Sequence, residues 1–262
     1  MMEALPEILG GMAAGSAGGL LSGLFGVGGG FVMIPLLALL LGLNQHSAQG
    51  ATLAIMAMPI GLPGIFQYRK KCLDLNLKIV AMVIAGFLFG VVLGSESANH
   101  IPQLPLRIGF TAFLLCVAVH GWFRRENSQA ESALSQSKPS VLLGVATGLL
   151  GGATSGLTGL GGAVVIIPLL INWFRMSQHQ AQFTSLLILL PPIGLPGVII
   201  YSKAQGGLPW WIIGSAWLGF DFGSYFGAKI ATKLSGARLK RFYSLVLLVM
   251  AAMMIWNIVN GL

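Results

Sequence analysis

The stretch GGLLSGLFGVGGGFVMIPLL at residues 18–37 occurs a second time, as GGATSGLTGLGGAVVIIPLL, at residues 151–170. The match continues without a gap to residues 75 and 208, and 28 of the 58 paired positions are identical at a spacing of 133 residues. It includes a second shared motif, PIGLPG, at residues 59–64 and 192–197. A duplicated apolar chain that is interrupted at matched Gly and Pro sites is typical of membrane transporters.

The composition places the chain in the membrane. Hydrophobic residues make up 55% and charged residues 8%, against about 25% charged in soluble domains. We therefore expect an all-α polytopic membrane protein with about 8–10 membrane segments. The net charge of +8 comes from residues in the loops between apolar spans, which favours orientation in a membrane over nucleic-acid binding.

The ends and the cysteines exclude other classes. The N-terminus carries Glu3 and Glu7 but no Lys or Arg before its apolar segment, so a cleaved signal peptide is not expected. Cys72 and Cys116 form no CxxC pair, so we expect neither a disulfide framework nor a metal site. We also expect no cofactor.

Each half contains five apolar segments. They lie near residues 6–26, 30–43, 47–68, 76–96 and 104–123, and near residues 141–159, 163–174, 179–201, 208–228 and 239–260. The second segment of each half makes only about 20 Å of helix, less than a bilayer of roughly 30 Å. The first two segments therefore form either two crossings or a re-entrant hairpin.

Loop charge relates the two halves. The connection between the third and fourth segments is basic in the first half (Arg69, Lys70, Lys71 and Lys78) but carries only Lys203 in the second. In the second half the basic residues follow the fourth segment, as Lys229, Lys233, Arg238, Lys240 and Arg241. Because positive loops face the cytoplasm, equivalent loops face opposite sides. We predict inverted-topology repeats at residues 1–123 and 141–262, a cytoplasmic linker at 124–140, and both termini outside the cytoplasm.

The glycine-rich motifs predict broken helices. Each glycine disfavours a helix by roughly 1 kcal/mol relative to alanine, so we expect breaks at residues 23–30 and 156–162. A helix that begins just after them, at Phe31 or Ala163, points N–H groups and its positive dipole end at the break, which suits an anion. The alternative is that the glycines permit close helix packing. Two inverted copies that meet near the midplane favour a binding site.

The PIGLPG motifs predict a second pair of breaks, inside the third segments, that act as plain kinks or as hinges. The hinge candidates are Pro59, Gly61, Pro63, Gly64, Pro192, Gly194, Pro196 and Gly197.

Polar side chains near the breaks are few. Hydroxyls such as Thr52, Thr154, Thr184 and Ser185 can also bond to their own backbone. The substrate-binding candidates are Ser22, Gly26, Gly28, Gly29, Gly30, Gln49, Ser155, Thr158, Gly159, Gly161, Gly162 and Gln182.

The matched sequences QHSAQ at 45–49 and QHQAQ at 178–182 begin the third segments. We expect Asn44 and Ser177 to cap these helices, with His46 and His179 either at the interface or able to titrate. Asp221 lies within a membrane segment, which indicates function by default. It relays a proton or forms an ion pair with a cation such as Lys229.

Together, the paired Gly-rich motifs with trailing IPLL, the paired GLPG motifs and the length resemble the TauE/SafE family over almost the whole chain. The resemblance implies a multi-pass protein of the bacterial cytoplasmic (inner) membrane that moves small sulfur-containing anions such as sulfite or organosulfonates. The implied partners are a small anion and membrane lipids; a homodimer is compatible with the sequence.

The function that follows is secondary transport by alternating access. An anion channel, or a transporter of another small organic anion, remains the alternative. The sequence has no HExxH, GxSxG or P-loop motif, so an enzyme and ATP hydrolysis are not expected. Neither the exact substrate nor the direction of transport can be read from it.

Overall fold

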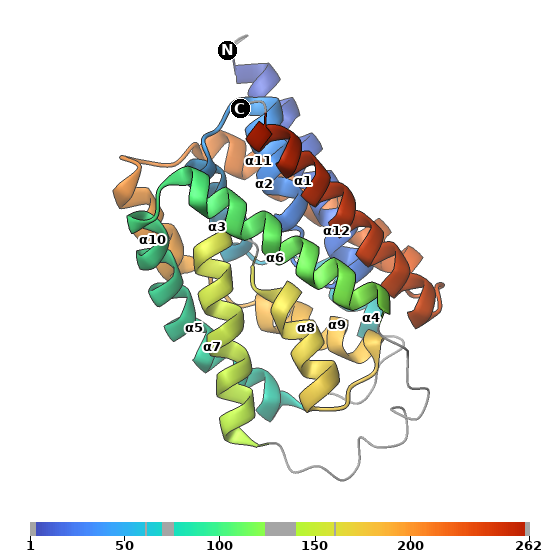
Figure 1. Ribbon diagram of the computed structural model, residues 1–262. Coiled ribbons are helices and arrows are strands. Elements are labelled where there is room, and N and C mark those ends of the chain that lie inside the picture. Colours follow the sequence, from blue (N-terminus) through green and yellow to red (C-terminus); the bar gives the residue numbers. More distant parts are fainter. Residues whose placement is uncertain (1–3, 61, 70–75, 124–139, 160, 260–262) are drawn as a thin grey trace.

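The computed structural model describes residues 4–60, 62–69, 76–123, 140–159 and 161–259 (Figure 1). Every regular element in these ranges is an α-helix. The first half contributes α1 (Ala4–Phe25), α2 (Gly30–Leu41), α3 (Gln45–Ala57), α4 (Leu62–Arg69), α5 (Leu77–His100) and α6 (Gln103–Phe123). The second half contributes α7 (Val141–Thr158), α8 (Ala163–Trp173), α9 (Gln178–Leu189), α10 (Leu195–Ala204), α11 (Trp210–Ala231) and α12 (Gly236–Val259).

The two halves contain the same six helices in the same order. The structure has breaks at both glycine motifs, but they are shorter than predicted: α1 continues to Phe25 and α2 begins at Gly30, while α7 continues to Thr158 and α8 begins at Ala163. Each third segment is divided at PIGLPG, into α3 and α4 or α9 and α10. Most of the linker and Cys72 lie outside the described residues. The duplicated sequence therefore gives a duplicated order of helices.

The helix lengths and surface suit a bilayer. Within the described residues, three helical stretches are long and apolar enough to cross it: Leu5–Phe25, Leu77–His100 and Val141–Thr158. The shorter α2 and α8, of 12 and 11 residues, are also apolar. Large apolar side chains are exposed on the outside, such as Leu142 at 78% and Trp211 at 79%. Such a surface is expected where lipid replaces water as solvent.

The halves exchange helices rather than pack as separate units. The long α1 packs along α11 and α7 packs along α5, so each interface joins one half to the other. Glycines allow the backbones to touch: a Cβ at Gly19 would lie 2.0 Å from the Phe220 carbonyl oxygen, and one at Gly152 would lie 2.2 Å from that of Phe87. This is the small-residue packing of membrane helices. Exchanging the halves turns one interface into the other.

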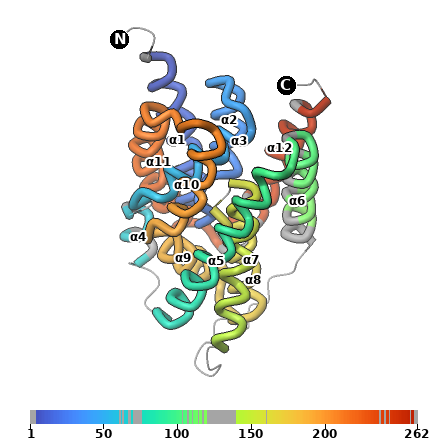
Figure 2. The backbone as a smooth tube through the Cα atoms, turned by 90° about the vertical axis from the view of Figure 1, so that its left-hand side faces the viewer, coloured from blue at the N-terminus to red at the C-terminus, as the bar shows by residue number. Residues whose placement is uncertain are grey.

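The helix directions follow from these contacts. Gly11 faces Ser215 and Gly23 faces Ser224, so α1 and α11 run in the same direction. In Figures 1 and 2, α6 and α12 run side by side in opposite directions, and α1 begins at the end of the molecule where α12 stops. We call this the terminal end. In both views α7 begins at the opposite end, which we call the linker end.

Candidate functional site

The two glycine breaks have the same backbone conformation. Gly26, Gly28 and Gly29 have φ values of 71°, 77° and 69°. Their equivalents Gly159, Gly161 and Gly162 have φ values of 74°, 80° and 69°. A residue with a side chain is destabilised by roughly 1–2 kcal/mol in this left-handed conformation. The glycines are therefore required by the shape of the breaks.

Each break folds one helix back on the other. A Cβ at Gly29 would lie 2.2 Å from the carbonyl oxygen of Gly18, and one at Gly162 would lie 2.2 Å from that of Gly151. The packing interpretation of the glycines is thus correct for these contacts, in addition to the break. Gly29 and Gly162 are also the N-caps of α2 and α8, and the described side chains make no capping bond there.

Each break rests on the opposite half. A Cβ at Gly26 would lie 2.8 Å from Gln182 Cα, and one at Gly159 would lie 2.8 Å from Gln49 Cα. The hydroxyl of Ser185 donates to the Gly26 carbonyl at 2.9 Å. The structure therefore brings the predicted glycines and glutamines together in two equivalent groups, each made by both halves.

Two equivalent serines, Ser22 and Ser155, lie one helical turn before the breaks. The carbonyl of Ser22 accepts from Gly26 N–H at 2.6 Å, and that of Ser155 accepts from Gly159 N–H at 2.7 Å. Both side chains are fully buried, and neither Oγ has a hydrogen-bond partner in the described part of the chain. Burying such a hydroxyl costs about 1–3 kcal/mol. Unsatisfied groups of this kind need an explanation, and a bound water or ligand is one.

The Gln49 side chain is held by protein at both ends. Its Nε2 donates to the Leu157 carbonyl at 3.3 Å, and its Oε1 accepts from the Tyr201 hydroxyl at 3.1 Å. The same hydroxyl lies 2.9 Å from the Gly156 carbonyl oxygen. In this conformation Gln49 therefore braces the second break.

Several other hydroxyls bond to their own helices. Thr52 Oγ1 donates to the Ala48 carbonyl at 2.8 Å, and Thr158 Oγ1 donates to the carbonyl of Thr154. For Thr52 and Thr158, the alternative that these hydroxyls bond to their own backbone is therefore correct.

The starts of α3 and α9 are capped as expected. Asn44 Oδ1 accepts from Ser47 N–H at 2.8 Å, and Ser177 forms a capping box with Gln180. His46 is buried at the start of α3, with its ring 6.3 Å from that of Tyr201.

The PIGLPG segments separate short helices. Helix α3 ends at Ala57 and α4 begins at Leu62, while α9 ends at Leu189 and α10 begins at Leu195. Pro59 and Pro192 precede the new helices, with Pro63, Gly64, Pro196 and Gly197 in their first turns, whereas Gly61 lies outside the described residues. At Gly194 an added Cβ would lie 3.0 Å from the Leu53 carbonyl oxygen.

Asp221 is half-buried on α11, and its backbone carbonyl accepts from Ser224 Oγ at 3.0 Å. The Lys229 ammonium lies 5.9 Å from the Tyr225 ring centroid.

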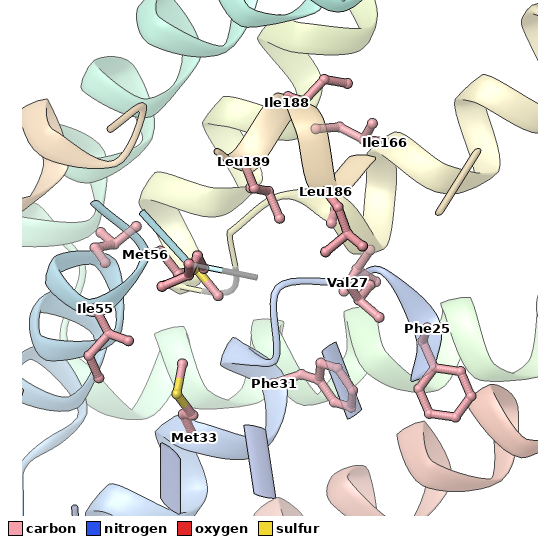
Figure 3. Packing of buried hydrophobic residues seen from close by; sticks show 14 of the residues in the cluster. Phe25, Val27, Phe31, Met33, Ile55, Met56, Ile166, Leu186, Ile188 and Leu189 are labelled. Atoms are coloured by element: carbon pink, nitrogen blue, oxygen red, sulfur yellow. The ribbon is translucent and has the colours of Figure 1, made fainter. Parts of the chain in front are cut away.

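Apolar side chains fill the space around the breaks. Figure 3 shows Val27 of the first break close to Leu186 of α9, with Met56 on the other side of the cluster. A Cβ at Gly161 would lie 2.5 Å from Met56 Sδ. The left-handed glycines of both breaks are buried: Gly26, Gly28, Gly29, Gly159, Gly161 and Gly162. This conformation is therefore closed around them.

Tyr201 was missed as a site residue. It is fully buried and contacts both Gln49 and the helix that leads into the second break. The sequence repeat could have indicated this residue, because Tyr68 occupies the equivalent position in the first half.

The family model described as sulfite exporter TauE/SafE matches residues 11–254. A probable membrane transporter protein of Haemophilus influenzae is 26% identical over 255 residues, covering 90% of this chain and 91% of the relative. Probable membrane transporter proteins of Bacillus subtilis and Methanocaldococcus jannaschii are each 28% identical, over 85% and 90% of this chain and 89% and 91% of their own lengths. No solved structure matches the chain at a significant level.

Proposed function

The chain belongs to the TauE/SafE family of membrane transporters, and we propose that it carries small sulfur-containing anions across the cytoplasmic (inner) membrane by alternating access. The observation that carries this proposal is the pair of equivalent breaks, each with a buried serine hydroxyl that lacks a partner in the described residues.

The proposed orientation places the linker end in the cytoplasm. Helix α11 runs parallel to α1, so Lys233 and Arg238 after it lie at the linker end. Helix α5 runs parallel to α7, as Gly86 facing Val145 and Gly94 facing Ala153 show, so Lys78 lies there too. Basic residues mark the cytoplasmic side. The opposite directions of α6 and α12 support an inverted relationship between the repeats (Figure 2).

The proposed site suits an oxyanion. Sulfite and sulfonates offer several acceptor oxygens and a negative charge. The starts of α2 and α8 offer positive dipole ends, and Ser22 and Ser155 add hydroxyl donors. A full positive charge is not needed for such binding.

The proposed movement takes place at the PIGLPG breaks. Because the glycine breaks are closed in this conformation, substrate enters only when elements around them shift. The short helices α4 and α10 are joined to α3 and α9 through non-helical segments, which can absorb a change in backbone angles. Displacement of Gln49 from Leu157 and Tyr201 would then turn its amide toward the substrate.

Transport in proteoliposomes tests the proposal. Purified protein is assayed for uptake of sulfite, thiosulfate, taurine, sulfoacetate and sulfate, with and without a pH gradient. We expect saturable movement of at least one sulfur anion and competition by the others. If none moves under either condition, the substrate assignment is wrong. Accumulation against a gradient separates a transporter from a channel.

Asp221 is the candidate for proton coupling. A carboxylate on a membrane helix is costly unless it has a role. We expect Asp221→Asn to retain folded protein and to lose the effect of the pH gradient on transport. Loss of folded protein with this substitution would assign Asp221 a structural role instead.

A further inference from the structure

A row of polar side chains on α3 and α10 runs inward from the terminal end. At its outer end, Gln205 Oε1 accepts from Asn44 Nδ2 at 3.5 Å and from Ser47 Oγ at 3.3 Å. Asn44 is exposed, and Ser47 and Gln205 are partly exposed. These bonds join the start of α3 to the end of α10 at the surface.

The next turn inward is closed by Tyr201. Tyr201 is fully buried although Gln205, four residues later, is partly exposed. One helical turn, about 6 Å, therefore separates this ring from the surface. Gly50 allows the close approach, because a Cβ there would lie 2.9 Å from Tyr201 Cβ and 2.9 Å from Leu208 Cδ2.

The Tyr201 hydroxyl lies between two acceptors. Gln49 Oε1 is 3.1 Å away and the Gly156 carbonyl oxygen is 2.9 Å away. A phenol has a single proton, so it donates fully to one of them at a time. Its proton therefore bonds to one acceptor or is shared between the two.

The row also contains polar atoms without partners. Gln45 is 2% exposed and His46 is 9% exposed. Gln45 Nε2 and His46 Nδ1 have no hydrogen-bond partner in the described residues, and neither has Ser155 Oγ beside the second break. Buried polar groups are normally satisfied by protein or water. A lining that lacks partners when closed is suited to hold water when the helices separate.

We propose that Tyr201 is the gate of a hydrated access path between α3 and α10, which leads from the terminal end to the second glycine break. The path is closed when the Tyr201 hydroxyl bonds to Gln49 and Gly156, and it opens when α10 moves away from α3. This inference rests on the proposed transport function and identifies the element that controls access from outside.

Accessibility of a buried cysteine tests the gate. The reporter is Ser155→Cys, in a chain where Cys72 and Cys116 are replaced by alanine. A membrane-impermeant methanethiosulfonate reagent is added to right-side-out vesicles without substrate. Tyr201→Phe keeps the ring and removes the hydroxyl, and we expect the reporter to react about fivefold to tenfold faster, the shift that one lost hydrogen bond produces. Tyr225→Phe, on an exposed tyrosine of α11, is the control and leaves the rate unchanged.

A second variant keeps the test decisive if Tyr201→Phe does not fold. Gly50→Ala retains the hydroxyl but pushes a methyl group against Tyr201 and Leu208, and it should also speed the reaction from outside. An unchanged rate in the folded variants, or faster reaction only from the cytoplasmic side, would overturn the proposal. Because the assay contains no substrate, its result does not depend on which anion is transported.

Discussion

Replacing Ser22 or Ser155 with alanine tests whether the hydroxyl serves substrate binding or the stability of the fold. Both hydroxyls are buried without a partner in the described residues. If they serve substrate binding rather than the fold, the closed protein carries their desolvation cost of about 1–3 kcal/mol without a compensating hydrogen bond. Alanine fills almost the same volume without this cost. We therefore expect each variant to be as stable as the parent or more stable, with the apparent Tm rising by about 2–4 °C per kcal/mol recovered.

The same substitutions should weaken binding of the transported anion, although they do not lower stability. A hydrogen bond to a charged ligand contributes about 1.5–3 kcal/mol, and 1.4 kcal/mol corresponds to a factor of ten in affinity. Each single variant should therefore raise the KM for the transported anion about tenfold or more. If the two hydroxyls act independently, the double variant should raise it about a hundredfold.

The measurements are thermal unfolding followed by tryptophan fluorescence and initial uptake rates over a range of substrate concentrations. Ser244→Ala is the matched control, because Ser244 is also fully buried, lacks a described partner and lies on α12 rather than on a helix that leads into a break. It should share the stability effect and leave the KM unchanged. The reasoning is refuted if Ser22→Ala and Ser155→Ala destabilise the protein by more than about 1 kcal/mol, or if they fold normally and transport with the parental KM.

Two further predictions concern the breaks and the orientation. Gly162→Ala should lower the apparent Tm far more than Gly42→Ala, because both have positive φ values but only the new methyl at 162 meets backbone, 2.2 Å from Gly151 O. Gly42 has nothing within 4 Å and should lose only the roughly 1–2 kcal/mol of a left-handed alanine; equal losses would contradict the close contact. In a cysteine-free background, Ala204→Cys should react with an impermeant reagent from outside, and Arg175→Cys only from the cytoplasm. Labelling of both from one side would contradict their placement at opposite ends of the molecule.

The positions of the breaks were predictable from the sequence. Local rules favour them: each glycine disfavours a helix, most strongly where glycines follow one another, as at Gly28 and Gly29, and PIGLPG removes backbone donors. The caps at Asn44 and Ser177 followed in the same way from short polar side chains before apolar runs. These features need only a few neighbouring residues, and the repeat supplied each signal twice.

The contacts between the halves were not predictable in the same way. Nothing local indicates that Gly26 packs on Gln182, or that Tyr201 reaches both Gln49 and Gly156. From the sequence alone, Gln49 is predicted to bind the substrate. Its partners come from α7 and α10, more than 100 residues away in the chain, and only the packing of the two halves places them there.

This exchange of helices also limits how the protein can move. Rocking one half as a unit against the other would pull α1 off α11 and α7 off α5, along interfaces where glycines bring the backbones into contact. The smallest groups that preserve both interfaces combine helices from both halves: α1 with α11, and α5 with α7. Movement at the segments between α3 and α4 and between α9 and α10 leaves these pairs intact. It also acts directly on Gln49 and Tyr201, which brace the second break. The exchanged pairs, rather than the sequence repeats, are therefore the bodies that alternating access would move.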